Sequence, residues 1–200
     1  VVCISEFTRQ EFLGRYSSIP EEKLKVIHGG VDLERFHPCS PGVIKERYEL
    51  NDYLLCVGEV RPYKNMENVF RALELWSDGP QLAISGKIFG DHKAKLENLA
   101  RSLNIENRVT WLGYVPDDLL PNLYSEAAAF IFPSLYEGFG LPILEAMACG
   151  CPTLSSNMAS LPEIGGKAAH FFDPKEIGDM AEAIKKVCED SVYRQKLSQG

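Results

Sequence analysis

Residues 132–152 read FPSLYEGFGLPILEAMACGCP, and this stretch decides the fold class. The short apolar run that ends here, residues 130–132 before Pro133, is typical of a buried parallel strand. A glycine-rich loop follows. A helix is predicted from Pro142 to just before Gly150, because proline favours the first helical position and glycine the position past a helix end. Strand, loop, helix and next strand together indicate one unit of a parallel α/β sheet.

The loop and the helix start contain groups that suit a ligand. Gly138 and Gly140 let the backbone turn tightly and approach a bound molecule. The N–H groups of a helix N-terminus suit a phosphate. Glu137 in the loop and Glu145 about one turn into the helix can face one crevice, and two carboxylates beside a phosphate site suggest a sugar with its nucleotide. The alternative is a plain helix start with a solvated glutamate, which the helix dipole favours.

Two cations follow another predicted strand. Residues 53–57 form a solid apolar run, and the loop at 58–65 contains Arg61 and Lys64. Ligands of open α/β sheets bind at the carboxyl ends of strands, and both cations suit a diphosphate. The alternative is two solvated loop cations.

The rest of the chain alternates short apolar strands with amphipathic helices, which predicts a parallel sheet covered on both faces. Helices are expected to be capped by Ser5, by Asn65, by one of the aspartates at 117–118 and by Asp173. No Gly-x-Gly-x-x-Gly motif occurs, which disfavours classical NAD or FAD binding. No P-loop and no Gly-x-Ser-x-Gly motif occurs either. Further strands are predicted at 1–4, 25–27, 82–84, 109–112, 153–155 and 169–172, and helices at 5–16, 65–76, 117–124, 173–188 and from 190 onward. Another helix is marked by the apolar residues Leu96, Leu99, Ala100 and Leu103.

Bulk composition narrows the class of protein further. The chain has 200 residues, 45% of them hydrophobic, which is enough for one compact α/β domain. Its net charge of −7 makes it a poor general binder of nucleic acid. Six cysteines without a Cys-x-x-Cys pair are expected to be reduced, buried or half-buried thiols rather than disulfides or metal ligands. A cytoplasmic setting follows. No signal peptide or membrane span is seen, although the chain begins within a strand pattern.

The central stretch resembles a known family. Glu137-Gly-Phe-Gly-Leu-Pro through Glu145-Ala-Met-Ala is similar to the donor-site motif of retaining glycosyltransferase family 4, and the resemblance extends from the first helix to the C-terminal helices. It implies a Rossmann-like parallel sheet with helices on both faces, the C-terminal half of a GT-B glycosyltransferase. Residues 1–28 are then the tail of the N-terminal domain and the interdomain connection, 29–42 a hinge, and 43–200 the donor-binding domain.

The resemblance also implies roles for individual residues. Glu137 and the amides after it touch the donor sugar, Glu145 holds the ribose hydroxyls, and the helix N-terminus receives the diphosphate. Lys64 matches the lysine that grips the donor phosphates. Arg61 stands for the family's arginine, which many members place directly after the glycine, where this chain has Glu59. Glu137, Lys64 and Arg61 are the expected catalytic set, and no metal is required. The expected donor-binding residues are Gly86, Val115, Gly138, Phe139, Gly140, Leu141 and Glu145.

Three other residues have competing interpretations. His28, in the hinge, is either a packing or hydrogen-bonding residue or a catalytic base. Tyr114 either packs or stacks on the nucleobase, which family members line mainly through backbone near Val115. Glu163 lies in a turn that braces the donor site in the family, and we expect a structural role for it.

The expected function is transfer of a hexose, mannose or glucose, from GDP-mannose or UDP-glucose to a glycan or lipid-linked acceptor with retention. The nucleotide-sugar is a substrate and no cofactor is expected. The expected partner is an N-terminal acceptor domain, without which the chain binds donor but transfers little. Membrane contact is expected only through that half, peripheral to the inner membrane. The alternatives are a sucrose- or trehalose-type synthase and a non-catalytic nucleotide-binding module; the central motif argues against a sugar-nucleotide epimerase.

Overall fold

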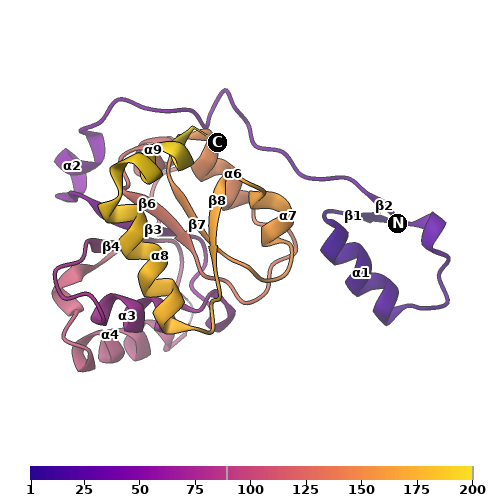
Figure 1. The fold of residues 1–200 in the computed structure, drawn as a ribbon, viewed down its shortest axis with the longest axis horizontal. Helices are drawn as coiled ribbons and strands as arrows, with labels where there is room; N and C mark the ends of the chain where they lie inside the picture. The colour runs from indigo at the N-terminus through magenta and orange to yellow at the C-terminus, as the bar shows by residue number, and fades with distance from the viewer. Residues whose placement is uncertain (89, 200) are drawn as a thin grey trace.

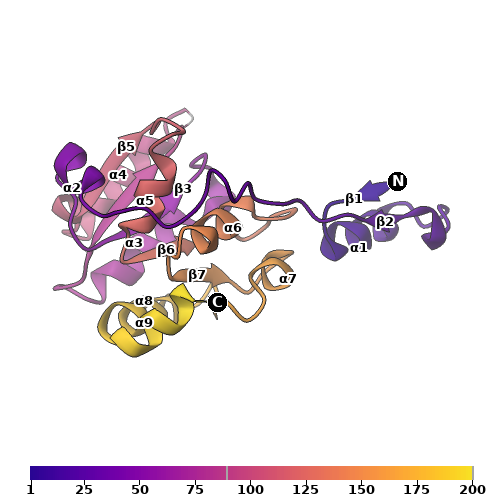
Figure 2. The same cartoon turned by 90° about the horizontal axis from the view of Figure 1, so that it is seen from above.

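The computed structural model describes residues 1–88 and 90–199. Across these residues the main body is a six-stranded parallel sheet in the order β5-β4-β3-β6-β7-β8, with helices on both faces (Figure 1 and Figure 2). The predicted fold class is confirmed. The strand order reverses between β3 and β6, which is where doubly wound sheets open a crevice for ligands. The strands are β3 (Tyr53–Val57), β4 (Gln81–Ser85), β5 (Val109–Gly113), β6 (Ala129–Phe132), β7 (Thr153–Ser156) and β8 (Ala169–Phe172).

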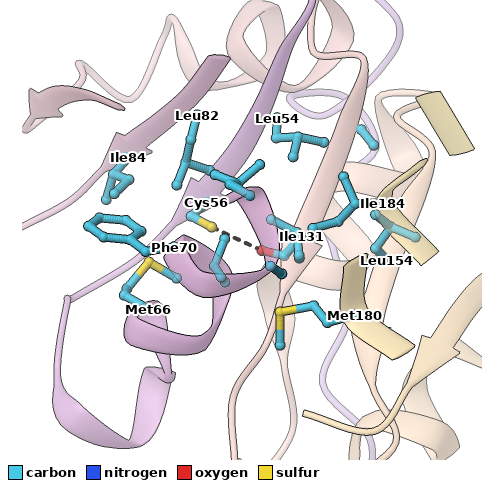
Figure 3. Packing of buried hydrophobic residues seen from close by; sticks show 14 of the residues in the cluster. Leu54, Cys56, Met66, Phe70, Leu82, Ile84, Ile131, Leu154, Met180 and Ile184 are labelled. Carbon is cyan, nitrogen blue, oxygen red and sulfur yellow. Dashed lines mark hydrogen bonds between the residues drawn. The ribbon is translucent and has the colours of Figure 1, made fainter. Parts of the chain in front are cut away.

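One face of the sheet is covered by α3 (Met66–Glu74), α4 (His92–Ser102), α8 (Ile177–Glu189) and α9 (Ser191–Ser198). Alternate residues of each strand point to this side, so Leu54 and Cys56 of β3 lie in one buried cluster with Phe70 of α3 and Met180 of α8 (Figure 3). The Cys56 thiol donates to the carbonyl of Ile131 on β6, 3.4 Å away. These contacts fix the positions of the two central strands relative to each other.

The other face is covered by α2 (Val43–Tyr48), α5 (Leu120–Ser125), α6 (Leu141–Ala148) and α7 (Leu161–Gly165). The intervening residues of the same strands, among them Leu55 and Phe130, pack against Ile143 of α6. The hydroxyl of buried Tyr53 donates to Leu123 of α5 at 2.7 Å. Short 3-10 turns, η2 (Pro62–Lys64) and η3 (Glu106–Arg108), precede α3 and β5.

The first 26 residues form a separate small unit at one end of the molecule (Figure 1). It contains the parallel pair β1 (Val2–Cys3) and β2 (Lys25–Val26), the helix α1 (Glu6–Arg15) and the turn η1 (Glu21–Lys23). An extended segment, residues 27–42, connects it to the sheet; this described segment contains turns but neither helix nor strand. The division at 1–28, 29–42 and 43–200 stays a prediction.

The predicted N-cap of α1 is confirmed. The Ser5 hydroxyl accepts from the Thr8 amide, and the Thr8 side chain accepts from the Ser5 amide in return. Asn65 also takes the predicted N-cap position, but its side chain makes no cap bond. Its amide instead donates to the carbonyl of Pro174 at 2.8 Å, tying the start of α3 to the turn before α8.

Two predicted helix starts are wrong. The helix α8 begins at Ile177, not at Asp173, because the Asp173 carboxylate accepts from the Lys175 amide and closes a local turn. The helix α5 begins at Leu120 rather than at the aspartates 117–118, and no side chain caps it. In both places an aspartate forms or borders a turn that precedes the helix.

Candidate functional site

Lys64 and Glu137 lie together at the switch point of the sheet. Lys64 ends the loop after β3, and Glu137 lies in the loop after β6. The Lys64 Nζ is 2.6 Å from Glu137 Oε1, and the two side chains are only 15% and 16% exposed. The ammonium also lies 4.5 Å from the centroid of the Phe132 ring at the end of β6. The topology therefore brings these two predicted residues, 73 positions apart, into one half-buried ion pair.

The two loops are also joined through their backbones. The amide of Leu135 donates to the carbonyl of Tyr63 at 2.8 Å. A pocket of about 300 Å³ opens beside this junction, lined by Tyr63, Tyr136, Glu137 and Gly138. The two loops that carry the ion pair are thus bonded to each other, and the pair lies next to open space.

Arg61 lies on the same loop as Lys64 but is engaged elsewhere. Its Nε donates to Glu59 Oε2 at 3.0 Å, and about half of each side chain is exposed. Glu59 directly follows Gly58 and occupies the position at which many members of the family that this chain resembles have their arginine. The two residues therefore form a local pair on the rim, and the predicted phosphate contact of Arg61 stays a prediction.

Glu145 lies on α6 and is held from the α5 side. The Tyr124 hydroxyl donates to Glu145 Oε2 at 2.8 Å. Burial raises the pKa of Glu145 above its ordinary value, although the Tyr124 hydrogen bond and the charge of Arg35 act in the opposite direction. Within residues 1–88 and 90–199, Glu145 makes no hydrogen bond or ion pair with Lys64 or Glu137. Convergence of all three on one ligand stays a prediction.

The loop that begins at Glu137 ends in a position that strongly favours glycine. Gly140, the N-cap of α6, has φ of 106°, and a Cβ there would lie 2.8 Å from Leu161. Gly138 does not have a left-handed backbone, and a Cβ there would meet only ordinary contacts at 3.5 Å and beyond. The helix begins at Leu141, which is 44% exposed, so Pro142 occupies its second position. Phe139 is buried.

Gly86 and Val115 lie at the carboxyl ends of the neighbouring strands. Gly86 has φ of 136°, and a Cβ there would come within 2.0 Å of the Gly58 carbonyl, so this glycine allows the loops after β3 and β4 to touch. The side chain of Val115 is buried, which leaves only its backbone for a ligand. A groove of about 350 Å³ at these strand ends is lined in part by Lys87, Trp111 and the exposed Tyr114.

Glu163 and His28 form a contact between the small N-terminal unit and the sheet. The Glu163 carboxylate accepts from the amides of Glu6 and Phe7 at the start of α1. His28 Nε2 lies 2.6 Å from Glu163 Oε1. Burial acts to raise the pKa of Glu163, but the bonds from Glu6, His28 and Phe7 together lower it. The structure therefore gives Glu163 the structural role predicted for it and His28 a hydrogen-bonding one.

Sequence reasoning missed two residues that support the site. Ser160 lies under the loop, and its Oγ is 2.9 Å from the Glu137 carbonyl. Tyr124 holds Glu145, as described above. Ser160 and Glu163 have the spacing Ser-x-x-Glu, which indicates a helix cap in a sequence, yet the Ser160 side chain makes no cap bond. The Ser-x-x-Glu spacing therefore indicated a helix cap, whereas the Ser160 hydroxyl bonds to the loop.

All six cysteines are free thiols, four buried and two half-buried, as predicted. In the part of the chain that the structure describes, no helix has both the length and the apolar character needed to cross a membrane.

Comparison with known proteins places the chain in a family. Residues 44–200 match the family model described as "Glycosyl transferases group 1". O-antigen chain mannosyltransferase B of Escherichia coli is 33% identical over 204 residues, covering 98% of this chain and 53% of that protein. O-antigen chain mannosyltransferase RfbU of Salmonella typhimurium is 29% identical, covering 93% and 50%. The chain thus spans about half the length of these two relatives.

Solved structures share the whole fold. Sucrose-phosphate synthase from Thermosynechococcus elongatus has a TM-score of 0.85 at 26% identity, covering 100% of this chain and 51% of that one. HepE of Anabaena, solved in complex with UDP and glucose, has a TM-score of 0.86 at 24% identity, covering 100% and 56%. The Rossmann-like sheet described above is the one found in GT-B glycosyltransferase structures. On the match over residues 44–200, the chain belongs to the glycosyl transferases group 1 family.

Proposed function

We propose that this chain is the donor-binding half of a retaining hexosyltransferase of glycosyltransferase family 4, which transfers mannose or glucose from a nucleotide-sugar to a glycan or lipid-linked acceptor. The observation that supports this most is the half-buried pair of Lys64 and Glu137 at the switch point of the sheet. The O-antigen mannosyltransferases among the relatives favour mannose. In this proposal residues 1–28 belong to the acceptor half and 29–42 are the hinge.

The chemical task is to stabilise charge on the departing diphosphate. The bond between the anomeric carbon and the phosphate oxygen breaks, a bond from the acceptor oxygen forms on the same face, and the acceptor proton passes to the departing phosphate. Lys64 has three N–H donors, so it can keep Glu137 and still donate to a phosphate oxygen. Together with Arg61 and the amides at the start of α6, it provides the electrostatic stabilisation.

The remaining contacts orient the donor. Glu137, fixed by Lys64, accepts from sugar hydroxyls, and Glu145, fixed by Tyr124, accepts from the ribose. Gly86 and the backbone at Val115 line the nucleobase at the ends of β4 and β5. The Glu137 carboxylate is neutralised by Lys64, which suits sugar binding better than covalent attack.

A second candidate is a synthase that transfers the sugar to a small sugar phosphate. The observation in its favour is the likeness to sucrose-phosphate synthase over all of this chain. The two candidates share the donor site and differ in the acceptor, so an acceptor assay on the two-domain enzyme separates them. A non-catalytic nucleotide-binding module is disfavoured, because Lys64 and Glu137 remain paired at the switch point.

Calorimetric titration of the chain with UDP, GDP, UDP-glucose and GDP-mannose tests the proposal. We expect one nucleotide and its sugar to bind, and Lys64→Met to weaken the diphosphate about tenfold or more, as expected for loss of a charge-assisted hydrogen bond. Lys185→Met, which removes the same charge from the exposed face of α8, is the control and should bind as the wild type does. Failure of the wild type to bind any of the four ligands would contradict the donor-site proposal.

A further inference from the structure

The loop at residues 137–140, here called the donor loop, is held from behind by a buried hydroxyl. Ser160 is fully buried, and its Oγ lies 2.9 Å from the carbonyl of Glu137 and 3.0 Å from that of Phe139. One hydroxyl proton is therefore shared between two carbonyls that belong to alternate peptide groups of the loop. Both carbonyls must point toward Ser160.

The N–H groups of the same two peptide groups then point away from Ser160. In a trans peptide the N–H lies across the plane from the preceding C=O. The carbonyls of Glu137 and Phe139 therefore direct the amides of Gly138 and Gly140 to the side remote from Ser160. Within residues 1–88 and 90–199, neither of these two amides donates a hydrogen bond. Two free donors are thus aligned by one buried side chain.

The peptide group between them is held by a different part of the chain. Ser5, also fully buried, donates from its Oγ to the Gly138 carbonyl at 2.7 Å, across 133 positions of sequence. The same Oγ accepts from the Thr8 amide as the N-cap of α1. Ser5 therefore connects the start of α1 directly to the middle of the donor loop.

The helix α7 contacts both α1 and the donor loop. Glu163, three residues after Ser160, accepts from the amides of Glu6 and Phe7 beside the Ser5 cap. Loop, α1 and α7 thus each contact the other two. Movement of the small N-terminal unit would pull on the Gly138 carbonyl through Ser5.

We propose that Ser160 and Ser5 are positioning residues that aim the donor-loop amides at the sugar of the bound nucleotide-sugar, and that Ser5 makes this aim depend on where residues 1–28 lie. The inference rests on the proposed function. Amides that are already aligned lose little conformational entropy when the ligand binds. A loop that is free to rotate its peptide groups must be ordered by the ligand, which lowers the affinity. The effect should fall on the sugar, because Lys64 and the helix start hold the diphosphate.

The test compares nucleotide and nucleotide-sugar binding in four variants. Titrations use UDP with UDP-glucose or GDP with GDP-mannose, whichever pair the wild type binds. Ser5→Ala and Ser160→Ala should weaken the nucleotide-sugar about three- to tenfold, as for one or two hydrogen bonds, and the nucleoside diphosphate less than about twofold. Thr8→Val is the matched control for Ser5. It removes the other half of the same helix cap and leaves the Gly138 contact in place.

The outcomes separate the possible failures. Thr8→Val should bind both ligands as the wild type does, even where urea unfolding shows it to be as destabilised as Ser5→Ala. If Thr8→Val and Ser5→Ala lost the same affinity for the nucleotide-sugar, Ser5 would act only as a helix cap and the inference would be overturned. If a variant lost the same affinity for the nucleoside diphosphate as for the nucleotide-sugar, the inference would also be overturned. Ser5→Thr, which keeps the hydroxyl, should restore sugar binding; failure to restore it overturns the role of the hydroxyl. A wild type that binds neither ligand overturns the proposed function itself.

Discussion

Lys64 is neutralised by Glu137 before any phosphate arrives, so a diphosphate must share its ammonium with a carboxylate 2.6 Å away. The two anions repel each other across the lysine. Glu137 therefore improves the placement of the lysine and weakens its hold on phosphate at the same time. Substitution of Lys64 and substitution of Glu137 should therefore change the affinity for the nucleoside diphosphate in different ways.

We expect Glu137→Gln to bind the nucleoside diphosphate a few-fold more tightly than the wild type and to lose sugar transfer in the two-domain enzyme. The neutral amide no longer competes for the Lys64 charge, and the weaker acceptor no longer orients the sugar. The same change should lower the free energy of unfolding by about 1–2 kcal/mol, as for a lost charged hydrogen bond. Calorimetry and urea unfolding measure the two effects, and weaker diphosphate binding would contradict the assignment.

Glu145 gives a pH-dependent prediction. Burial raises its pKa above the ordinary 4.5, so the native state holds a proton more tightly than the unfolded chain does. Its contribution to stability is then present at low pH and is lost as pH rises through the folded pKa. Glu145→Gln should gain stability relative to the wild type between pH 4 and pH 7 in urea unfolding. Tyr124→Phe removes the hydrogen bond that lowers this pKa. The loss of stability with rising pH should therefore be steeper in Tyr124→Phe than in the wild type.

The sequence was sufficient for some residues of the site and not for others. Lys64 and Glu137 could be placed together because each follows an apolar strand, and parallel strands bring their carboxyl ends to one edge. Ser160 could not be found, because a serine hydroxyl bonds to whichever backbone carbonyl the fold places beside it. Tyr124 was placed only as the end of a predicted helix, and its bond to Glu145 depends on how α5 packs against α6.

At the scale of elements, the start of α6 depends on a single glycine. Gly140→Ala should lower the free energy of unfolding by about 1–3 kcal/mol, because its φ of 106° is strained for alanine and the new Cβ would press on Leu161. Gly138→Ala is the matched change two residues earlier. Its Cβ has room, so stability should change by less than about 0.5 kcal/mol. Urea unfolding of the two variants measures the contrast, and equal losses would contradict the explanation.

Strands were predicted more accurately than helix starts. The strands at 53–57 and 169–172 were predicted with their observed bounds. The first is a continuous apolar run buried in the sheet, which is typical of a parallel strand. The starts of α5 and α8 were each placed a few residues too early. An aspartate before a helix can either cap it or close a turn, and Asp173 does the latter. Tertiary packing decides between these options, and the local sequence does not.

At the scale of the whole molecule, Glu163 joins the N-terminal unit to the sheet. Its carboxylate is the acceptor for the first amides of α1 and for His28. These partners favour the charged form and, against the effect of burial, lower the pKa of Glu163. The stability from this contact is therefore present above the ordinary carboxyl value and is lost as pH falls through the folded pKa. Docking of α1 should weaken in acid.

We expect Glu163→Gln to loosen α1 at neutral pH and to remove most of the acid dependence of its docking. Hydrogen exchange at the Glu6 and Phe7 amides reports this directly, since Glu163 accepts both. In the wild type, protection of these amides should fall as pH drops below about 4.5, after correction for the intrinsic pH dependence of exchange. Glu182→Gln, on the exposed side of α8, carries the same charge change and should leave that protection unaltered. If the wild type and Glu163→Gln lost protection in parallel on acidification, another group would control how the small unit docks. In that case the coupling from residues 1–28 to the donor loop would have to pass through Ser5 alone.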